Sequence, residues 1–351
     1  MPSLSGRPFM ITHTIPSERK GLAFAEYLDN KEQRQFVLRA LKGTLIKGNV
    51  LNDAIQEEVS NFVRNLKTQE GTGIQVVGLF NLAVLNSVWN CIISAKLPLD
   101  ELSQILLEAS NRITTIGGLL VQLGVFIPWF GSSFPNFTNI ISGIEAYKDL
   151  YTFLDERIKR HRETWIKNTP RDFIDAYLDK IEETTDENST FFAGKNFIRS
   201  TVADLFIASS DTTAAALEFS MLYLAKYSDV QKRIQDEMSE IVPILKGTKF
   251  TRPEIWQDPE NFLPERFMKE DSQQKRKLLH AFSVGRRICP GDRIARDEIF
   301  MFITGILQKF DIKITSTIPS LDGEFGFARH PKPFKVTFSS RITSLDNKCT
   351  K

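Results

Sequence analysis

The chain has 351 residues, of which 42% are hydrophobic and 25% are charged, and its formal net charge is +2. A chain of this size can bury a sizeable core as one or two domains, and its near-neutral charge gives no reason to expect nucleic acid as a partner. The three cysteines (Cys91, Cys289 and Cys349) are far apart and odd in number. This argues against a disulfide framework and favours a reducing compartment or the cytosolic face of a membrane.

The first strong helical pattern covers residues 30–42. It carries Phe36, Val37 and Leu41 on one side. No apolar segment with a cleavage site precedes this helix, so no signal peptide is predicted. Residues 71–95 lack charge but contain several polar residues, a combination that predicts a buried helix rather than a membrane span.

Residues 113–144 form a second stretch without charged residues. Its apolar part, residues 117–131, is broken by Gly124 and Pro128 and is too short to cross a bilayer. We expect this part to be buried. The alternative is an apolar loop that dips into a membrane surface.

Three further helical patterns follow, at residues 145–166, at residues 171–183 and from about residue 197 to residue 239. In the first of them the expected apolar stripe consists of Leu150, Phe153, Leu154, Ile158 and Trp165. The last pattern is expected to break near Ser228 and Asp229. After residue 245 the chain becomes Pro-rich and irregular, and two short strands are predicted towards its end, in the stretches DIKITST and PFKVTF.

The decapeptide FSVGRRICPG, residues 282–291, places Cys289 after a basic loop and just before an amphipathic pattern. A helix amino end and neighbouring cations both favour the thiolate, which is the form of cysteine that binds metal. A small buried core cysteine is the alternative.

The run ASSDTT, residues 208–213, lies within the long apolar pattern. An acidic residue followed by a hydroxyl on a buried helix can bind water and relay protons. Two alternatives remain open: the run caps a helix that starts near Ala214, or Thr212 bonds back to its own helix.

The spacing F-x-x-G-x-R-x-C-x-G closely resembles the heme-binding loop of the cytochrome P450 family, and ASSDTT resembles the oxygen-activating stretch of that family. The resemblance implies a mainly α fold with minor β, and heme b (iron protoporphyrin IX) with the Cys289 thiolate as its axial metal ligand. It implies these cofactor-binding residues: Arg34, Phe282, Gly285, Arg287, Cys289 and Gly291. Thr212 and Asp211 would be the catalytic residues that deliver protons. Ser209 replaces the usual glycine and is expected to narrow the oxygen site.

The stretch around Arg34 resembles the family helix that carries W-x-x-x-R, whose arginine pairs with a heme propionate. Asn30 stands at the tryptophan position, so one usual propionate partner is absent. Arg287 is the better candidate for a second propionate contact. Without the resemblance, this segment would be interpreted as an exposed charged helix face.

Residues 256–267 resemble the family segment that precedes the heme loop, and their Arg266 normally joins a Glu-x-x-Arg pair from an earlier helix. No glutamate in this chain has an arginine three residues later. We therefore expect an internal deletion near residues 243–253, an incomplete fold, and an Arg266 without its usual partners. The membrane anchor and first sheet strands of the family are also expected to be missing, which leaves a single domain at residues 1–342 and a disordered tail at 343–351.

Residues 319–336 resemble the carboxy-terminal hairpin of the family, whose turn contacts substrate. Phe325 and Phe327 are the expected pocket residues, and ordinary core packing is the alternative for both. Other chemistries find little support, because the chain has no H-E-x-x-H, no C-x-x-C, no P-loop and no G-x-G-x-x-G.

The function implied by the resemblance is insertion of one oxygen atom from O2 into an apolar xenobiotic, steroid or fatty acid. Electrons would come from an NADPH-dependent flavoprotein reductase on the cytosolic face of the endoplasmic reticulum. The chain itself would have no transmembrane anchor but a possible peripheral membrane contact. One alternative is a non-catalytic remnant that binds heme weakly or not at all. Another is a heme-thiolate isomerase that needs no reductase, although Asp211 and Thr212 argue against it.

Overall fold

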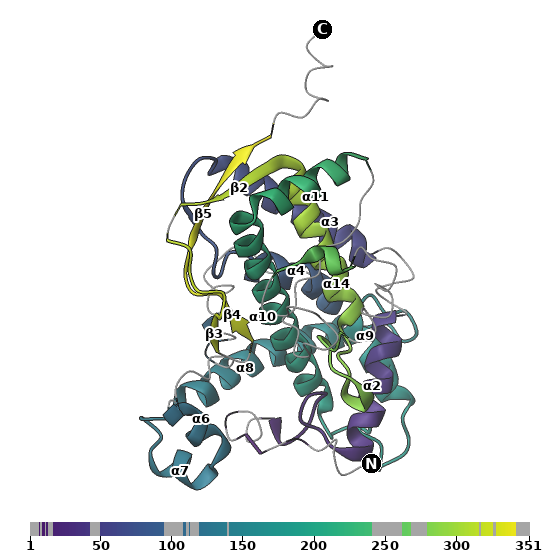
Figure 1. The fold of residues 1–351 in the computed structure, drawn as a ribbon. Helices are drawn as coiled ribbons and strands as arrows, with labels where there is room; N and C mark the ends of the chain where they lie inside the picture. The colour runs from purple at the N-terminus through teal and green to yellow at the C-terminus, as the bar shows by residue number, and fades with distance from the viewer. Residues whose placement is uncertain are drawn as a thin grey trace.

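The computed structural model describes residues 7, 9–10, 12, 17–42, 50–94, 108–109, 112, 119–138, 140–240, 262–267, 279–315, 317–325 and 328–341. Within this part the prediction of a mainly α fold with minor β is confirmed (Figure 1). The helices are α2 (Tyr27–Ala40), α3 (Val50–Thr68), α4 (Asn81–Ile93), α6 (Leu119–Phe126), α7 (Pro128–Ser133), α8 (Ile140–Thr164), α9 (Phe173–Glu183), α10 (Phe197–Lys226), α11 (Ser228–Glu240) and α14 (Asp292–Lys309), with short 3-10 turns η3 (Pro264–Phe267) and η4 (Gly285–Arg287). The strands are β1 (Ile74–Gln75), β2 (Phe310–Ile314), β3 (Glu324–Phe325), β4 (Arg329–His330) and β5 (Lys335–Ser340).

Helix α10 runs through the middle of the molecule and packs against α4, α8 and α14 (Figure 1). It has 30 residues and is apolar on nearly all sides, as expected of a helix surrounded by protein. Its last turn closes when the Tyr227 N–H donates to the carbonyl of Tyr223 (2.8 Å), and α11 begins at the next residue. The predicted break near Ser228 is therefore confirmed.

The larger sheet has three antiparallel strands in the order β1-β5-β2, and the smaller one pairs β3 with β4. The two strands predicted near the end of the chain are confirmed as β2 and β5, whose register places Ile312 opposite Phe338. The short β3–β4 hairpin places Glu324 opposite His330. Helix α10 packs against both β2 and β4, so the two sheets flank the central helix.

Phenylalanine rings build much of the core. Phe62 stacks on Phe80 with ring centroids 4.9 Å apart, and Phe302 of α14 meets Phe62 edge-on at 5.5 Å. A second aromatic group joins α2 to α9 and to the segment before α10, where Phe36 lies 5.1 Å from both Tyr177 and Phe191. Such offset and edge-on pairs stabilise the fold beyond the area they bury.

The amphipathic helices predicted at 30–42, 145–166 and 171–183 are confirmed as α2, α8 and α9. Val37, Leu150 and Leu154 from their expected apolar stripes are fully buried. The uncharged stretch 71–95 contains α4, which is buried among other helices as expected, with Trp89 at its centre.

The burial expected for residues 117–131 is wrong for most of residues 121–131, the part whose burial the structure describes. Helices α6 and α7 pack against each other, and Trp129 (69% exposed) and Phe126 (47% exposed) face outward. The physical reason is a close approach of two glycines, because a side chain on Gly131 would collide with the carbonyl of Gly124. The small residues therefore occupy the contact between the two helices and leave the large ones outside. Among the described helices none is both long and apolar enough to cross a membrane.

Candidate functional site

Cys289 lies at the end of a loop, residues 279–291, that we call the cysteine loop. The N–H of Cys289 donates to the carbonyl of Phe282 (2.9 Å) and closes the loop. Gly285 has a φ of +77°, a left-handed conformation that strongly favours glycine. Gly291 caps the amino end of α14, which begins at Asp292.

The thiol environment differs from the one expected. Burial raises the pKa of the Cys289 thiol, and the Asp292 carboxylate raises it further. A hydrogen bond from the Gly291 N–H and the charge of Arg34 both lower this pKa. The Gly291 N–H at the helix end and the Arg34 guanidinium both favour the thiolate, as expected, but burial outweighs them and leaves the pKa of the thiol raised. A bound metal cation deprotonates a coordinating thiol outright, so the thiol remains suitable as a ligand.

Arg34 of α2 reaches the cysteine loop across 254 positions of sequence, and its Nη2 donates to the carbonyl of Ile288. Burial lowers the pKa of Arg34, and the nearby Cys289 opposes that change. The structure thus brings Arg34 and Cys289 together, as the resemblance implied. A guanidinium beside the loop suits the carboxylate of a ligand.

Arg287 points to a different partner, the amino-terminal segment before α2. It donates to the carbonyls of Ala25 (2.7 Å) and Leu22 (3.4 Å). Asn30 also donates to Leu22 (2.8 Å), whose own N–H is 2.6 Å from the buried carboxylate of Asp204. Burial raises the pKa of Asp204 to about 7. The contact of Arg287 with a propionate stays a prediction.

Phe282 and the start of α14 also meet. The guanidinium of Arg296 lies over the Phe282 ring, 4.5 Å from its centroid, and pairs with Asp292. This cation–π contact fixes the ring at the entrance of the cysteine loop. A Cβ on Gly291 would lie 3.9 Å from the Cys289 sulfur, an ordinary contact, so space alone does not require glycine there.

Helix α10 carries a strip that the described residues leave uncovered. Ala208 and Thr212, one turn apart, are exposed although most of the helix is buried. The Thr212 hydroxyl donates to the carbonyl of Ala208 (2.9 Å), so Thr212 bonds back to its own helix, which was one of the two alternatives. The other alternative, a cap for a helix starting near Ala214, is wrong because α10 continues through the run. Ser209 is half-buried and donates to the Phe206 carbonyl.

Asp211, the other residue implied for proton delivery, is buried and bonded to His330 of β4 (3.0 Å). The second ring nitrogen of His330 bonds to Glu218, also on α10 (2.8 Å). Sequence reasoning missed His330. The available signal was that Asp211 and Glu218, seven residues apart, share one face of an apolar helix and would need a cation there.

These features fit the heme that the resemblance implies. Val284 (59% exposed) and Ile288 (40% exposed) present apolar surface beside the half-buried Cys289 thiol. The uncovered strip of Ala208 and Thr212 offers small side chains on the central helix. A soft sulfur ligand with apolar surroundings suits a thiolate-bound iron porphyrin.

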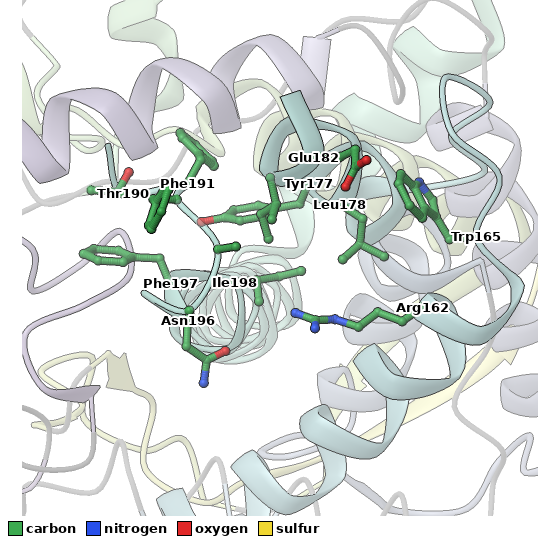
Figure 2. A pocket seen from close by; sticks show the side chains of 14 residues that line it. Arg162, Trp165, Tyr177, Leu178, Glu182, Thr190, Phe191, Asn196, Phe197 and Ile198 are labelled. Carbon is green, nitrogen blue, oxygen red and sulfur yellow. The ribbon is translucent and has the colours of Figure 1, made fainter. Parts of the chain in front are cut away.

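Two other features of the described residues lie apart from these. His161, Asp172 and Asp175 come within metal-binding range of one another, but Asp172 bonds His161 (2.8 Å) and caps α9, and Arg171 clamps Asp175. A cavity of about 510 Å³ lies between α9 and the start of α10 (Figure 2). The described residues that line this cavity include none of the predicted site residues.

Several expectations fall outside the described residues. These concern the side chains of Arg266, Phe325 and Phe327, the interval 243–253 and the tail 343–351. Beside Arg266, the carboxylate of Glu265 pairs with Arg233 of α11. This pair connects the turn η3 to α11.

Comparisons with known proteins agree with the fold and the cysteine loop. The family model described as Cytochrome P450 matches residues 2–250 and 247–338. Similar proteins include cytochrome P450 2L1 of Panulirus argus (26% identical over 405 residues, 96% of this chain and 82% of the relative). Cytochrome P450 2J2 of Homo sapiens is 27% identical over 354 residues, 84% of this chain and 70% of the relative.

Farnesoate epoxidase of Bombyx mori is 26% identical over 403 residues, which cover 96% of this chain and 80% of the relative. A zebrafish cytochrome P450 structure with progesterone shares the fold, with a TM-score of 0.80, 22% identity, and coverage of 95% of this chain and 88% of that chain. Since the family model matches almost the whole sequence in two adjoining parts, this chain belongs to the cytochrome P450 family.

Proposed function

We propose that this P450 monooxygenase holds heme b through the Cys289 thiolate and inserts one oxygen atom from O2 into an apolar organic substrate. The observation that carries the proposal is the cysteine loop with Arg34 bonded to it, together with the uncovered strip on α10. When bound, the heme supplies the redox chemistry. The polypeptide supplies the ligand, the pocket and the proton route.

The sulfur of Cys289 would hold the iron, and the Gly291 N–H that reaches this sulfur would temper its charge. Arg34 and Arg287 would bind the propionates. Their guanidinium groups already lie at the cysteine loop and donate to backbone carbonyls. Phe282, Gly285 and Gly291 would shape the loop around the ring.

Thr212 would present its hydroxyl to the reacting site, since its side chain is exposed on the uncovered strip. Asp211, its neighbour, would belong to the proton route. Ser209 lies half-buried on the same helix, and its extra hydroxymethyl group would narrow the space for oxygen. Apolar side chains beside the cysteine loop favour a substrate of the xenobiotic, steroid or fatty-acid class.

Electrons would come from an NADPH-dependent flavoprotein reductase on the cytosolic face of the endoplasmic reticulum. The α6–α7 pair would contact the membrane surface, because four large apolar side chains are exposed in and after it. These are Phe126, Trp129, Phe134 and Phe137.

One observation favours a second candidate, a non-catalytic remnant that binds heme weakly or not at all. The two matches to the family model meet at residues 247–250, inside the interval 243–253 where we propose an internal deletion. The Glu-x-x-Arg pair that would brace Arg266 is absent from the sequence. A loss there would weaken the support of the cysteine loop.

The spectrum of the reduced, carbon-monoxide-bound protein separates the two candidates. The proposed function predicts a thiolate-type Soret band in the wild type and in Cys349→Ser, and loss of the band in Cys289→Ser. NADPH-dependent product formation with added reductase then tests turnover. A soluble folded wild type without the band would leave the remnant as the correct description.

A further inference from the structure

One imidazole joins the carboxy-terminal hairpin to the central helix. His330 of β4 lies between two carboxylates of α10, with Nε2 at 3.0 Å from Asp211 and Nδ1 at 2.8 Å from Glu218. Both ring nitrogens face carboxylate oxygens. A neutral imidazole can donate from one nitrogen only, whereas an imidazolium donates from both. An imidazolium donating to both carboxylates satisfies the two contacts together.

Burial makes this cation necessary. The side chains of Asp211 and Glu218 are 6% and 1% exposed, whereas that of His330 is 24% exposed. Two buried carboxylates seven residues apart on one helix are costly unless a positive charge and hydrogen bonds satisfy them. The hydrogen bonds to Asp211 and Glu218 raise the pKa of His330 to about 10.

The other groups around the cluster are consistent with this charge state. The Gly78 N–H donates to the second oxygen of Glu218 (2.7 Å). Glu324 of β3 lies opposite His330 in the hairpin, and Arg329 precedes His330 in β4. The cluster thus unites α10, the β3–β4 hairpin and the turn after β1.

We propose that His330 is a positioning residue for the monooxygenase reaction, holding Asp211 as a carboxylate and fixing the hairpin against α10 beside Thr212. This inference rests on the proposed function, in which Asp211 and Thr212 form the proton route. Asp211 is the residue directly before Thr212, and its bonded carboxylate orients this part of the helix. His330 acts through Asp211 and does not itself touch the substrate.

The proposal predicts a change in the pH profile when the positive charge is removed. In His330→Gln the amide can still form hydrogen bonds, but the two buried carboxylates lose their cation. A proton then takes its place, so the variant binds an extra proton at a pH where the wild type does not. Product formed per NADPH is expected to fall about tenfold in the variant as the pH is lowered from 8 to 6. The wild type is expected to stay level over this range.

Two further variants separate charge from packing. His330→Lys keeps the positive charge and is expected to restore the level profile at least in part. His161→Gln is the matched control, because His161 also bonds a buried aspartate, Asp172 (2.8 Å), but between α8 and α9. This control is expected to keep the wild-type profile.

A measurement on the wild type alone protects the test from a variant that fails to fold. Nitrogen-15 NMR of the imidazoles in the diamagnetic ferrous carbon-monoxide form should show both nitrogens of His330 protonated up to pH 9. Titration of His330 near pH 6.5 would overturn the proposal, as would identical pH profiles of the wild type and His330→Gln. Absence of the thiolate-type band and of turnover in the wild type would overturn the proposed function, and this positioning role with it.

Discussion

Glu298 on α14 allows the sharpest prediction about stability. Its side chain is buried, and burial raises its pKa to about 8. The carboxyl contacts the Ser87 hydroxyl of α4, which also lies 2.8 Å from the Val84 carbonyl. The Ser87 hydroxyl donates to the Glu298 carboxyl, and this bond opposes the rise of the pKa. Burial outweighs it and favours the neutral acid.

The size of the effect follows from the pKa shift. A rise from 4.5 to about 8 means that the folded state binds more protons than the unfolded state between these two pH values. Stability that is fully present below pH 4.5 is therefore lost as the pH rises through 8. At about 1.4 kcal/mol per pKa unit, the loss is roughly 5 kcal/mol. Glu298→Gln keeps the shape without the titration and is expected to lack this loss.

Urea unfolding at pH 5, 6, 7 and 8, followed by tryptophan fluorescence, measures the free energies of unfolding of the wild type and of Glu298→Gln. The wild type should lose stability with rising pH relative to Glu298→Gln. Glu163→Gln, a change at an exposed carboxylate of α8, should follow the wild type. If the curves of the wild type and Glu298→Gln run parallel from pH 5 to 8, Glu298 is not a buried neutral acid and the reasoning fails.

Three other substitutions test the surroundings of the site. Gly305→Ala in α14 would place a Cβ 2.5 Å from the Val59 side chain of α3. This overpacking costs about 1–3 kcal/mol and outweighs the gain of about 1 kcal/mol from helix propensity. Thermal melts should therefore show a lower Tm for the variant. Thr212→Ala removes a hydroxyl whose one partner among the described residues is the carbonyl of Ala208 in its own helix. The free energy of unfolding should therefore change by less than about 0.5 kcal/mol, while product per NADPH falls and peroxide release rises. Gly285→Ala meets open space but has a left-handed backbone, which costs about 1–2 kcal/mol and should weaken heme retention during gel filtration.

Much of the helical framework could be predicted from periodicity. The 3.6-residue spacing of apolar side chains identified α2, α8, α9 and α10, and alternation identified β2 and β5. The outward face of α6–α7 could not be predicted, since it depends on which side two glycines occupy when the helices pack. Hydrophobicity alone does not separate a segment that is buried from one that faces outward.

The candidate site also divides into features that the sequence predicts and features that depend on the folded structure. The spacing around Cys289 pointed to its loop, and the resemblance placed Arg34 beside it. The direction of the Cys289 pKa shift could not be predicted, because it depends on how deeply the folded chain buries the sulfur. The pairing of Asp211 with His330 spans 119 positions, and no local pattern connects residues so far apart.

The carboxylates of α10 have a consequence for how the chain is made. Asp204 is satisfied by the backbone of residues that precede it by about 180 positions. Glu218 has one such earlier partner in the Gly78 N–H, but the cation that Asp211 and Glu218 share, His330, lies more than 110 positions later. On the ribosome, the first partner has therefore already emerged when α10 is synthesised, but the second has not. Until the hairpin arrives, closing the core would bury the carboxylates of Asp211 and Glu218 without their cation, which opposes early closure. The hairpin in the last tenth of the chain is thus expected to complete the core late, after the earlier helices have been synthesised.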